Sequence, residues 1–212
     1  VHNMNRTMLD QRGSYEVLVE GIRAYQTMCA SRGKSTKLQA IQTTTRFSLP
    51  YATEIVNEYE ELGADALYLR PLTPLGQAAK NWDSIGYTAD AYLDFYRQAV
   101  LTMLTHCRSG KTIREITAST YLRRILCHQA VYHTEFRSPC GGGVGQMAVH
   151  YNGDVYTCDE GRMLASSGDG AFKLGTVLDS YHKLISSPVV HALCTASCIE
   201  GLPSCCECVY QP

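Results

Sequence analysis

Cysteines gather toward one end of this chain. Seven of its ten cysteines lie within the last 73 of 212 residues, at Cys140, Cys158, Cys194, Cys198, Cys205, Cys206 and Cys208. Thiolates are preferred protein ligands of zinc and of iron–sulfur clusters, and such a centre needs several of them to converge from separate segments. The pattern therefore predicts a soft-metal site built mainly by this part of the chain.

Other uses of these thiols remain open. A closed zinc knuckle could use four thiolates, Cys194, Cys198, Cys205 and Cys208, without any redox chemistry. Disulfides are the third interpretation, after an iron–sulfur cluster and zinc. Adjacent cysteines such as Cys205 and Cys206 rarely have the geometry to form a bridge with each other. The three remaining cysteines are interpreted as buried apolar thiols in helices: Cys29, Cys107 and Cys127. A thiol enzyme that pairs Cys127 or Cys206 with His128 or His133 ranks lowest, since adjacent helical residues face different sides.

Composition narrows the class of protein. The chain is 45% hydrophobic and 18% charged, which is ordinary for a soluble globular protein. A formal net charge of −1 with mixed signs gives no basic stripe for nucleic acid. No apolar run is long enough to span a bilayer, so we expect no membrane partner and a cytoplasmic location. Because the chain begins at Val1 and ends four residues after Cys208, we expect a fragment of a longer protein.

Helices and strands should alternate in the first part of the chain, residues 1–137. Apolar spacing predicts helices at 14–30, from Pro50, at 88–106 and at 113–133, with strands at 37–45 and 66–69. The stripe of the first helix is expected at Val17, Leu18, Ile22, Tyr25 and Met28. Strand, helix and strand within about 30 residues indicate a βαβ unit and a parallel sheet. The loop through Pro74, Gly76 and Trp82 is expected to lack regular structure.

Functional groups in parallel α/β folds lie at the carboxyl ends of the strands. Here those ends present Thr45, among Thr43–Arg46, and Arg70 after the next strand. These two residues are the candidate cofactor-binding residues of the first domain.

The second part, residues 138–212, is expected to consist of short strands and loops. Asn152-Gly153 between two apolar runs predicts a hairpin, and a two-residue turn would place Cys158 opposite Met147. The hairpin would then aim Cys158 at the region to which Cys140 could return. The glycine-rich run 141–145 either permits close packing there or is a flexible linker.

The spacing of these cysteines resembles a known family motif. Cys140, twelve residues, Gly153, four residues, Cys158, a gap and Cys205-x-x-Cys208 resemble the start of the SPASM motif. That motif marks C-terminal extensions of radical S-adenosylmethionine (radical SAM) enzymes. The stretches 158–163, 172–175 and 202–205 resemble the maturase of the His-Xaa-Ser peptide system, a relative of anaerobic sulfatase-maturating enzymes. Stretches near 5–16, 43–46, 55–59 and 69–72 resemble the later βα units of the partial barrel in those maturases.

This resemblance implies a fold and a set of site residues. The fold is α/β: a partial parallel (β/α) barrel fragment followed by a small SPASM-like metal-binding domain with a β-hairpin. Cys140 and Cys158 would ligate a first auxiliary 4Fe-4S cluster, and Cys205 and Cys208 a second. Asp159 matches a carboxylate proposed to take a proton from the substrate. The extra cysteine that sulfatase maturases place six positions after the first is Gln146 here, so the resemblance implies a first cluster that is differently ligated or has an open position.

The resemblance also implies cofactors and partners. The complete protein would be a peptide-modifying oxidoreductase that uses 4Fe-4S clusters and S-adenosyl-L-methionine. It would act on a peptide or protein substrate and take electrons from a donor such as flavodoxin or ferredoxin. The defining Cys-x3-Cys-x2-Cys motif is absent from these 212 residues, because Gly201 stands where Cys194-x3-Cys198 would need its third cysteine. We therefore expect this chain alone not to cleave S-adenosylmethionine.

Overall fold

The computed structural model describes residues 1–6, 10, 13–127 and 137–208. The chain divides into two compact units, Val1–Cys127 and His128–Pro212, whereas the sequence places the division after residue 137. Each unit is described by itself. Within the described ranges, no helix combines the length and apolarity needed to cross a bilayer. His128, His133 and the end of the helix predicted at 113–133 lie outside the described residues.

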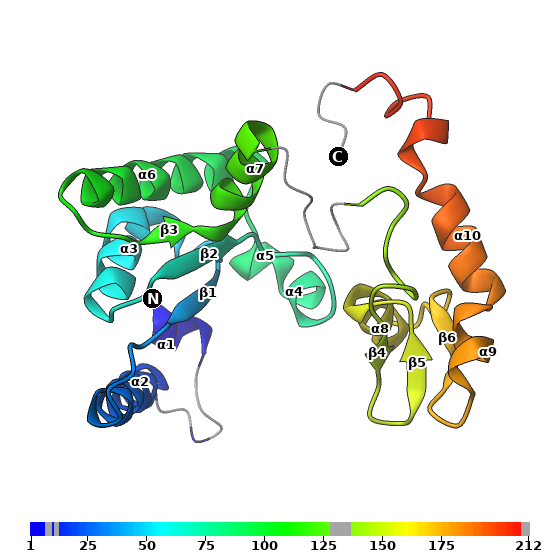
Figure 1. The fold of residues 1–212 in the computed structure, drawn as a ribbon, viewed down its shortest axis with the longest axis horizontal. Coiled ribbons are helices and arrows are strands. Elements are labelled where there is room, and N and C mark those ends of the chain that lie inside the picture. Colours follow the sequence, from blue (N-terminus) through cyan, green and yellow to red (C-terminus); the bar gives the residue numbers. More distant parts are fainter. Residues whose placement is uncertain (7–9, 11–12, 128–136, 209–212) are drawn as a thin grey trace. The chain divides into compact units, whose positions relative to one another are not determined.

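A three-stranded parallel sheet organises the first unit. Its strands, in the order β1-β2-β3, are β1 Gln39–Thr43, β2 Ala66–Arg70 and β3 Arg114–Glu115 (Figure 1). Helix α3, Ala52–Glu61, joins β1 to β2, and helix α6, Ala89–Arg108, lies between β2 and β3 in the chain. The expected α/β class with a parallel sheet is confirmed. No closed barrel forms among the described strands.

The core of the first unit lies between this sheet and its two long helices. Leu67 and Leu69 of β2 are almost wholly buried, as are Val56 of α3 and Ala99 of α6. Helices α3 and α6 pack together, and Phe95 and Met103 complete the inward face of α6. β2 is therefore buried at Ala66, Leu67 and Leu69, as expected of a central parallel strand, while Tyr68 is partly exposed and Arg70 is exposed at its end.

Strand β3 went unpredicted, because two residues leave no periodic signal in the sequence. Glu115 at its end is 4% exposed, and its carboxylate accepts hydrogen bonds from Leu69 N (3.3 Å), Tyr96 Oη (2.7 Å) and Ala118 N (2.6 Å). The predicted helix that follows begins later than expected, at α7 Ile116–Cys127. Burial, followed by the hydrogen bond to Glu115, raises the pKa of the Tyr96 phenol.

Helix α2, Tyr15–Ser31, forms where predicted, but its burial differs from the prediction. Val17, Leu18, Tyr25 and Met28 are 55, 43, 38 and 45% exposed, while Val19 and Cys29 are buried. The apolar stripe therefore does not face the core of this unit. Cys107 and Cys127 are also exposed, so the interpretation of them as buried thiols is wrong.

Several helices of the first unit are short, and two of them occupy the segment that was expected to lack regular structure. α1 His2–Asn5 opens the chain, the 3-10 helix Leu49–Tyr51 precedes α3, and the segment after β2 contains α4 Gln77–Lys80 and α5 Trp82–Ile85. These helices of three or four residues are too short to show a helical period.

Among its described residues, 137–208, the second unit combines a small antiparallel sheet with three α-helices and a 3-10 helix. The strands are β4 Ala148–Val149, β5 Asp154–Tyr156 and β6 Lys173–Thr176. The helices are α8 Asp159–Ser166, α9 Tyr181–Ile185 and α10 Pro188–Ala196, with a 3-10 helix at Ile199–Gly201 (Figure 1). The expectation of strands and loops alone is wrong. Val155, Leu174, Leu184 and Val190 form its buried core.

The predicted hairpin is present with a different register. Ala148 pairs with Tyr156 and Val149 with Val155. Gly153, at φ +87°, closes a three-residue loop in which its N–H donates to His150 O at 2.9 Å. A left-handed glycine after two turn residues is typical of the hairpin loop with a bulge. The extra loop residue shifts the register by one, so the predicted pairing of Cys158 with Met147 is wrong.

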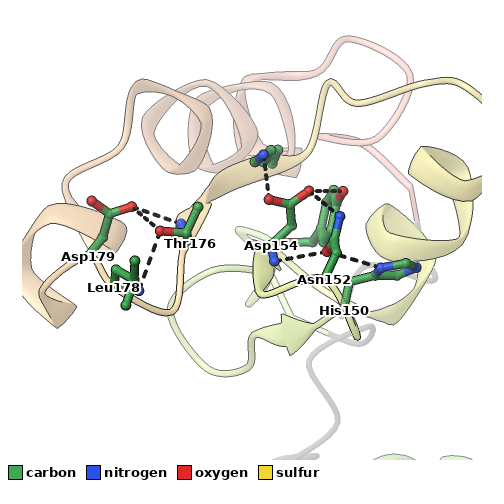
Figure 2. A network of polar contacts seen from close by, with 8 residues as sticks. His150, Asn152, Asp154, Thr176, Leu178 and Asp179 are labelled. Atoms are coloured by element: carbon green, nitrogen blue, oxygen red, sulfur yellow. Dashed lines mark hydrogen bonds and ion pairs between the residues drawn. The ribbon is translucent and has the colours of Figure 1, made fainter.

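Two groups of polar contacts stabilise this sheet, one at Asp154 in the hairpin and one at Asp179 after β6 (Figure 2). Asp154 forms an ion pair with Lys173 Nζ at 2.6 Å and accepts a hydrogen bond from Asn152 Nδ2 at 2.9 Å. Asp179 accepts from Thr176 N at 2.8 Å and forms an ion pair with Lys183. The Lys173 ammonium holds the pKa of Asp154 below its usual value, and the hydrogen bond from Lys183 does the same for Asp179.

Candidate metal-binding site

The glycine run after Cys140 is packed into the second unit. Gly141, Gly142 and Gly143 are buried, and Gly142 N–H points at Cys140 Sγ at 3.5 Å. Gly143, at φ +79°, donates its N–H to Thr157 O at 2.7 Å. A Cβ on Gly143 would lie 2.7 Å from Val190 Cγ2, so glycine is needed there for space as well as for backbone angle. Of the two interpretations of this run, close packing is confirmed and the flexible linker is wrong.

Cys158 caps the helix that follows the hairpin. Its backbone is extended, and its Sγ accepts a hydrogen bond from Gly161 N at 3.4 Å at the start of α8. Burial raises the pKa of the Cys158 thiol, and the Gly161 N–H opposes that rise. An N–H directed at sulfur is the kind of contact that stabilises and orients a metal-bound thiolate.

Thr157 connects the Cys140 loop with Cys158. It is completely buried, and its hydroxyl donates to Cys158 Sγ at 3.8 Å. A Cβ built on Gly142 would lie 3.5 Å from Thr157 Cβ and 3.6 Å from Cys140 Sγ. The two cysteines that the family resemblance would assign to one cluster therefore belong to loops that meet at a single residue.

Hydrogen bonds attach the Cys140 segment to the end of helix α10. Cys140 N–H donates to Ser197 Oγ at 2.8 Å, and Ile199 N–H donates to Ser138 Oγ at 3.1 Å. Cys198 lies between these two partners in the chain. Cys194, one turn before Ser197, packs against the core of the second unit. These two cysteines, which the iron–sulfur assignment leaves without a role, thus flank a segment that holds Cys140.

Cys205 and Cys208 lie together in a tight turn near the end of the described chain. Cys208 N–H donates to Cys205 O at 3.0 Å, and Cys205 N–H donates to Leu202 O at 2.8 Å. These hydrogen bonds bring the backbones of Cys205 and Cys208 together in one turn. Cys205 is partly buried and Cys208 is exposed.

The donor set fits a soft metal only in part. Cys140 and Cys158 offer sulfur atoms that already receive backbone N–H groups, and Gly142 permits close packing beside Cys140, because a Cβ there would lie 3.0 Å from Leu193 Cδ2 and 3.6 Å from Cys140 Sγ. Across residues 1–6, 10, 13–127 and 137–208, however, no three His, Cys, Asp or Glu side chains form a group that could hold a metal ion. The described residues therefore do not form a complete ligand set for a metal ion.

The predicted catalytic residue Asp159 is the first residue of α8. Its side chain is 65% exposed, and its Oδ1 accepts from Arg162 Nε at 2.9 Å and Nη2 at 2.6 Å. A carboxylate in the first turn of a helix is also stabilised by the helix dipole. Asp159 is therefore next to Cys158 in the chain, accessible, and oriented by an arginine.

The predicted cofactor residues of the first unit lie at neighbouring strand ends. Thr43 pairs with Arg70 in the parallel register, so Thr45 and Arg70 follow the same edge of the sheet. Arg70 is exposed, and its carbonyl accepts Thr44 N–H at 2.9 Å. Thr45 is 6% exposed, and its hydroxyl donates to Asn5 Oδ1 at 2.8 Å. The shared edge supports the placement of these residues, while their role stays a prediction.

A cavity of about 890 Å³ opens in the first unit beside β1. Its walls come from α1, α2, β1 and α3, and they include the exposed Val17, Leu18 and Ile41. Glu58, also in the wall, accepts a hydrogen bond from Tyr15 that raises the pKa of this tyrosine to about 12. Neither Thr45 nor Arg70 is among the residues described as lining the cavity, although Asn5 links Thr45 to it.

Comparisons with protein-family models, with curated proteins and with solved structures found no match to this chain.

Residue-by-residue reading of the sequence missed several parts of this site. Thr157 directly precedes Cys158, and its position before a candidate ligand was the available signal. Ser197 and Gly161 gave no such signal, because their contacts depend on where α10 and α8 pack. The cavity beside β1 also depends on tertiary structure, since the pattern of α2 predicts a face buried in the core.

Proposed function

We propose that this chain is part of a radical S-adenosylmethionine enzyme that modifies a peptide or protein after translation. In this proposal, Cys140 and Cys158 ligate one auxiliary 4Fe-4S cluster, and Cys205 and Cys208 contribute to a second. The observation that carries it is the meeting of the Cys140 and Cys158 loops at Thr157, with a backbone N–H directed at each sulfur.

The first unit supports the same proposal more weakly. Its parallel βαβ arrangement suits a fragment of a partial (β/α) barrel, with Thr45 and Arg70 at the carboxyl edge where a cofactor such as S-adenosyl-L-methionine would bind. Asp159 is assigned as the residue that takes a proton from the substrate. A bound cluster would supply electron transfer, and flavodoxin or ferredoxin is the proposed class of donor.

Anaerobic reconstitution with iron and sulfide tests the proposed cofactor. We expect a brown protein that contains iron and acid-labile sulfide, and we expect a C140A/C158A double variant to lose about half of both. The matched control is Cys107→Ala, an exposed cysteine of the first unit. Binding of zinc without sulfide would instead support the four-thiolate zinc module built from Cys194, Cys198, Cys205 and Cys208.

The same preparation tests whether this chain alone can cleave S-adenosylmethionine. Incubation with S-adenosylmethionine and a reductant should yield no methionine and no 5′-deoxyadenosine, since the sequence contains no Cys-x3-Cys-x2-Cys motif. Formation of both products would show that the 212-residue chain is itself competent, which the proposal denies.

A further inference from the structure

Strand β1 lies at an edge of the parallel sheet, because β2 is its only partner among the described strands. Thr44 N–H donates to Arg70 O at 2.9 Å, so the backbone groups of Thr44 and Gln42 are directed toward β2. The direction of these groups alternates along a strand, and those of Ile41 and Thr43 therefore point away from β2. Outside the ladder between β1 and β2, the described residues form no hydrogen bond with the backbone of Ile41. The free edge of β1 can thus accept a further strand.

The cavity of about 890 Å³ lies beside this edge. Its wall includes Ile41 and Thr43, the residues of β1 whose backbone groups point away from β2. Apolar side chains that are exposed to solvent form another part of the wall, namely Ile41 of β1 and Val17 and Leu18 of α2. The cavity therefore offers an apolar surface next to unpaired main-chain donors and acceptors.

Charged groups of opposite sign lie on different sides of the cavity. Glu54 and Glu58, one turn apart on α3, both line it, and Glu58 accepts a hydrogen bond from Tyr15. Glu54 is exposed and forms no hydrogen bond or ion pair with the other described residues. Arg6 and the Val1 amino group lie in the part of the wall that comes from the start of the chain. A cationic side chain in the cavity would therefore be attracted to the α3 side.

We propose that β1 and this cavity form a binding site for an extended peptide, which joins the sheet as a strand beside β1. Aliphatic side chains of the peptide pack against Val17, Leu18 and Ile41, and a basic side chain pairs with Glu54. Main-chain hydrogen bonds supply affinity in this mode of recognition, and the side-chain contacts supply selectivity. A compact ligand would fill the cavity but leave the edge of β1 unpaired. The site stands on the contacts of the first unit and needs no metal, so it goes beyond the proposed function.

Fluorescence anisotropy with the labelled peptide Thr-Val-Lys-Val-Thr and the 212-residue chain tests the proposal. Two N-methylated forms of the peptide are compared, one methylated at both valines and the other at the lysine and the last threonine. The N–H groups of alternate residues in a strand face opposite edges, so only one form blocks the hydrogen bonds to β1. We expect saturable binding of the parent peptide and about tenfold weaker binding of one methylated form alone.

Ile41→Pro tests the same edge from the side of the protein. It removes an N–H that faces away from β2, and proline is tolerated at such positions of edge strands. We expect I41P to bind the peptide about tenfold more weakly, and the control Ile41→Val, which keeps the N–H, to bind like the wild type. If circular dichroism shows that I41P does not fold, the pair of methylated peptides decides the question.

Glu54→Gln tests the charge. We expect E54Q to weaken binding of the lysine peptide about threefold, and to leave unchanged the binding of a peptide with norleucine in place of lysine. The matched control is Glu61→Gln, an exposed carboxylate of the same helix that is not among the residues lining the cavity. Equal effects of E54Q on the two peptides would contradict the assignment of Glu54.

Several outcomes would overturn the proposal. Failure of the parent peptide to bind at millimolar concentration would show that the edge does not take up a strand. Equal binding of the two methylated forms would show that the peptide does not pair with β1. Sedimentation that finds a dimer of the wild type and a monomer of I41P would assign the edge to a second copy of this chain. Because none of these measurements uses iron or sulfide, their result is independent of the test of the proposed enzyme class.

Discussion

Glu115 is a buried carboxylate on which three parts of the first unit meet. It accepts hydrogen bonds from β2 through Leu69 N, from α6 through Tyr96 and from the first turn of α7 through Ala118 N. Because the carboxylate is 4% exposed, water does not replace these partners. The residue therefore fixes the start of α7 against the sheet.

We predict that Glu115→Ala lowers the free energy of unfolding of the first unit by about 3 kcal/mol, because two N–H groups and one hydroxyl lose their acceptor. Glu115→Gln keeps an acceptor oxygen and should cost about half as much. Urea denaturation followed by circular dichroism measures both changes. The control, Glu61→Ala, removes an exposed carboxylate at the end of α3 and should leave the midpoint unchanged. Equal effects at positions 61 and 115 would contradict this account.

At single positions, the sequence was informative where chemistry depends on residue type. Cys140 and Cys158 could be singled out because few residues other than cysteine bind soft metals. Thr157 and Glu115 could not, because threonine and glutamate are common on surfaces and their importance here comes from complete burial beside specific partners. Burial of a polar residue is a property of tertiary structure.

The carboxylates around the hairpin give the second unit a defined pH response. Ion pairs with lysines depress the pKa values of Asp154 and Asp179 in the folded chain. A depressed folded pKa contributes stability above the unfolded pKa, and that stability is lost as the pH falls through the folded value.

We therefore predict that the second unit loses stability as the pH falls below about 4, and that Asp154→Asn flattens this dependence. Urea midpoints between about pH 7 and about pH 3 measure it, with hydrogen exchange of Val155 reporting on the sheet. Asp169→Asn, at an exposed carboxylate of the same unit, serves as the control. If D154N and the wild type lose stability in parallel, Asp154 does not cause the response.

Prediction at the level of elements was good for long helices and poor for short or shifted elements. Apolar spacing predicted four elements that the structure contains: helices α2 and α6 and strands β1 and β2. β3 has two residues, and the hairpin differs by one residue of register because Tyr151, Asn152 and Gly153 all belong to the loop. The period of α2 predicted a helix correctly, but period alone does not say which neighbour covers its apolar face.

For the whole chain, the two units differ in how much apolar core the described residues supply. The cluster in the first unit contains ten buried residues, and the cluster in the second contains four. A small unit with few buried residues commonly needs metal ligation to reach a stable fold. The α/β class of the first unit followed from the alternation of patterns, whereas the helices of the second unit and this imbalance are visible only in the structure.

We predict that removing metal loosens the second unit and leaves the first unchanged. Hydrogen exchange of the chain prepared anaerobically, with and without a chelator, should show faster exchange at Val155 and Leu174 in the chelated sample. Leu67 and Leu69 of β2, which are buried in the first unit, provide the internal control. Equal protection of the second unit in both samples would mean that its fold does not depend on metal.

The three-residue loop of the hairpin has a consequence for how the chain can vary. The backbone from Gly153 to Cys158 passes through β5, whose pairing with β6 is irregular between Val155 and Tyr156. One inserted or deleted residue in this stretch would change the register of β5 and displace Thr157 and Cys158 from their present contacts. The interval between Gly153 and Cys158 should thus tolerate many changes of residue type but no change in length.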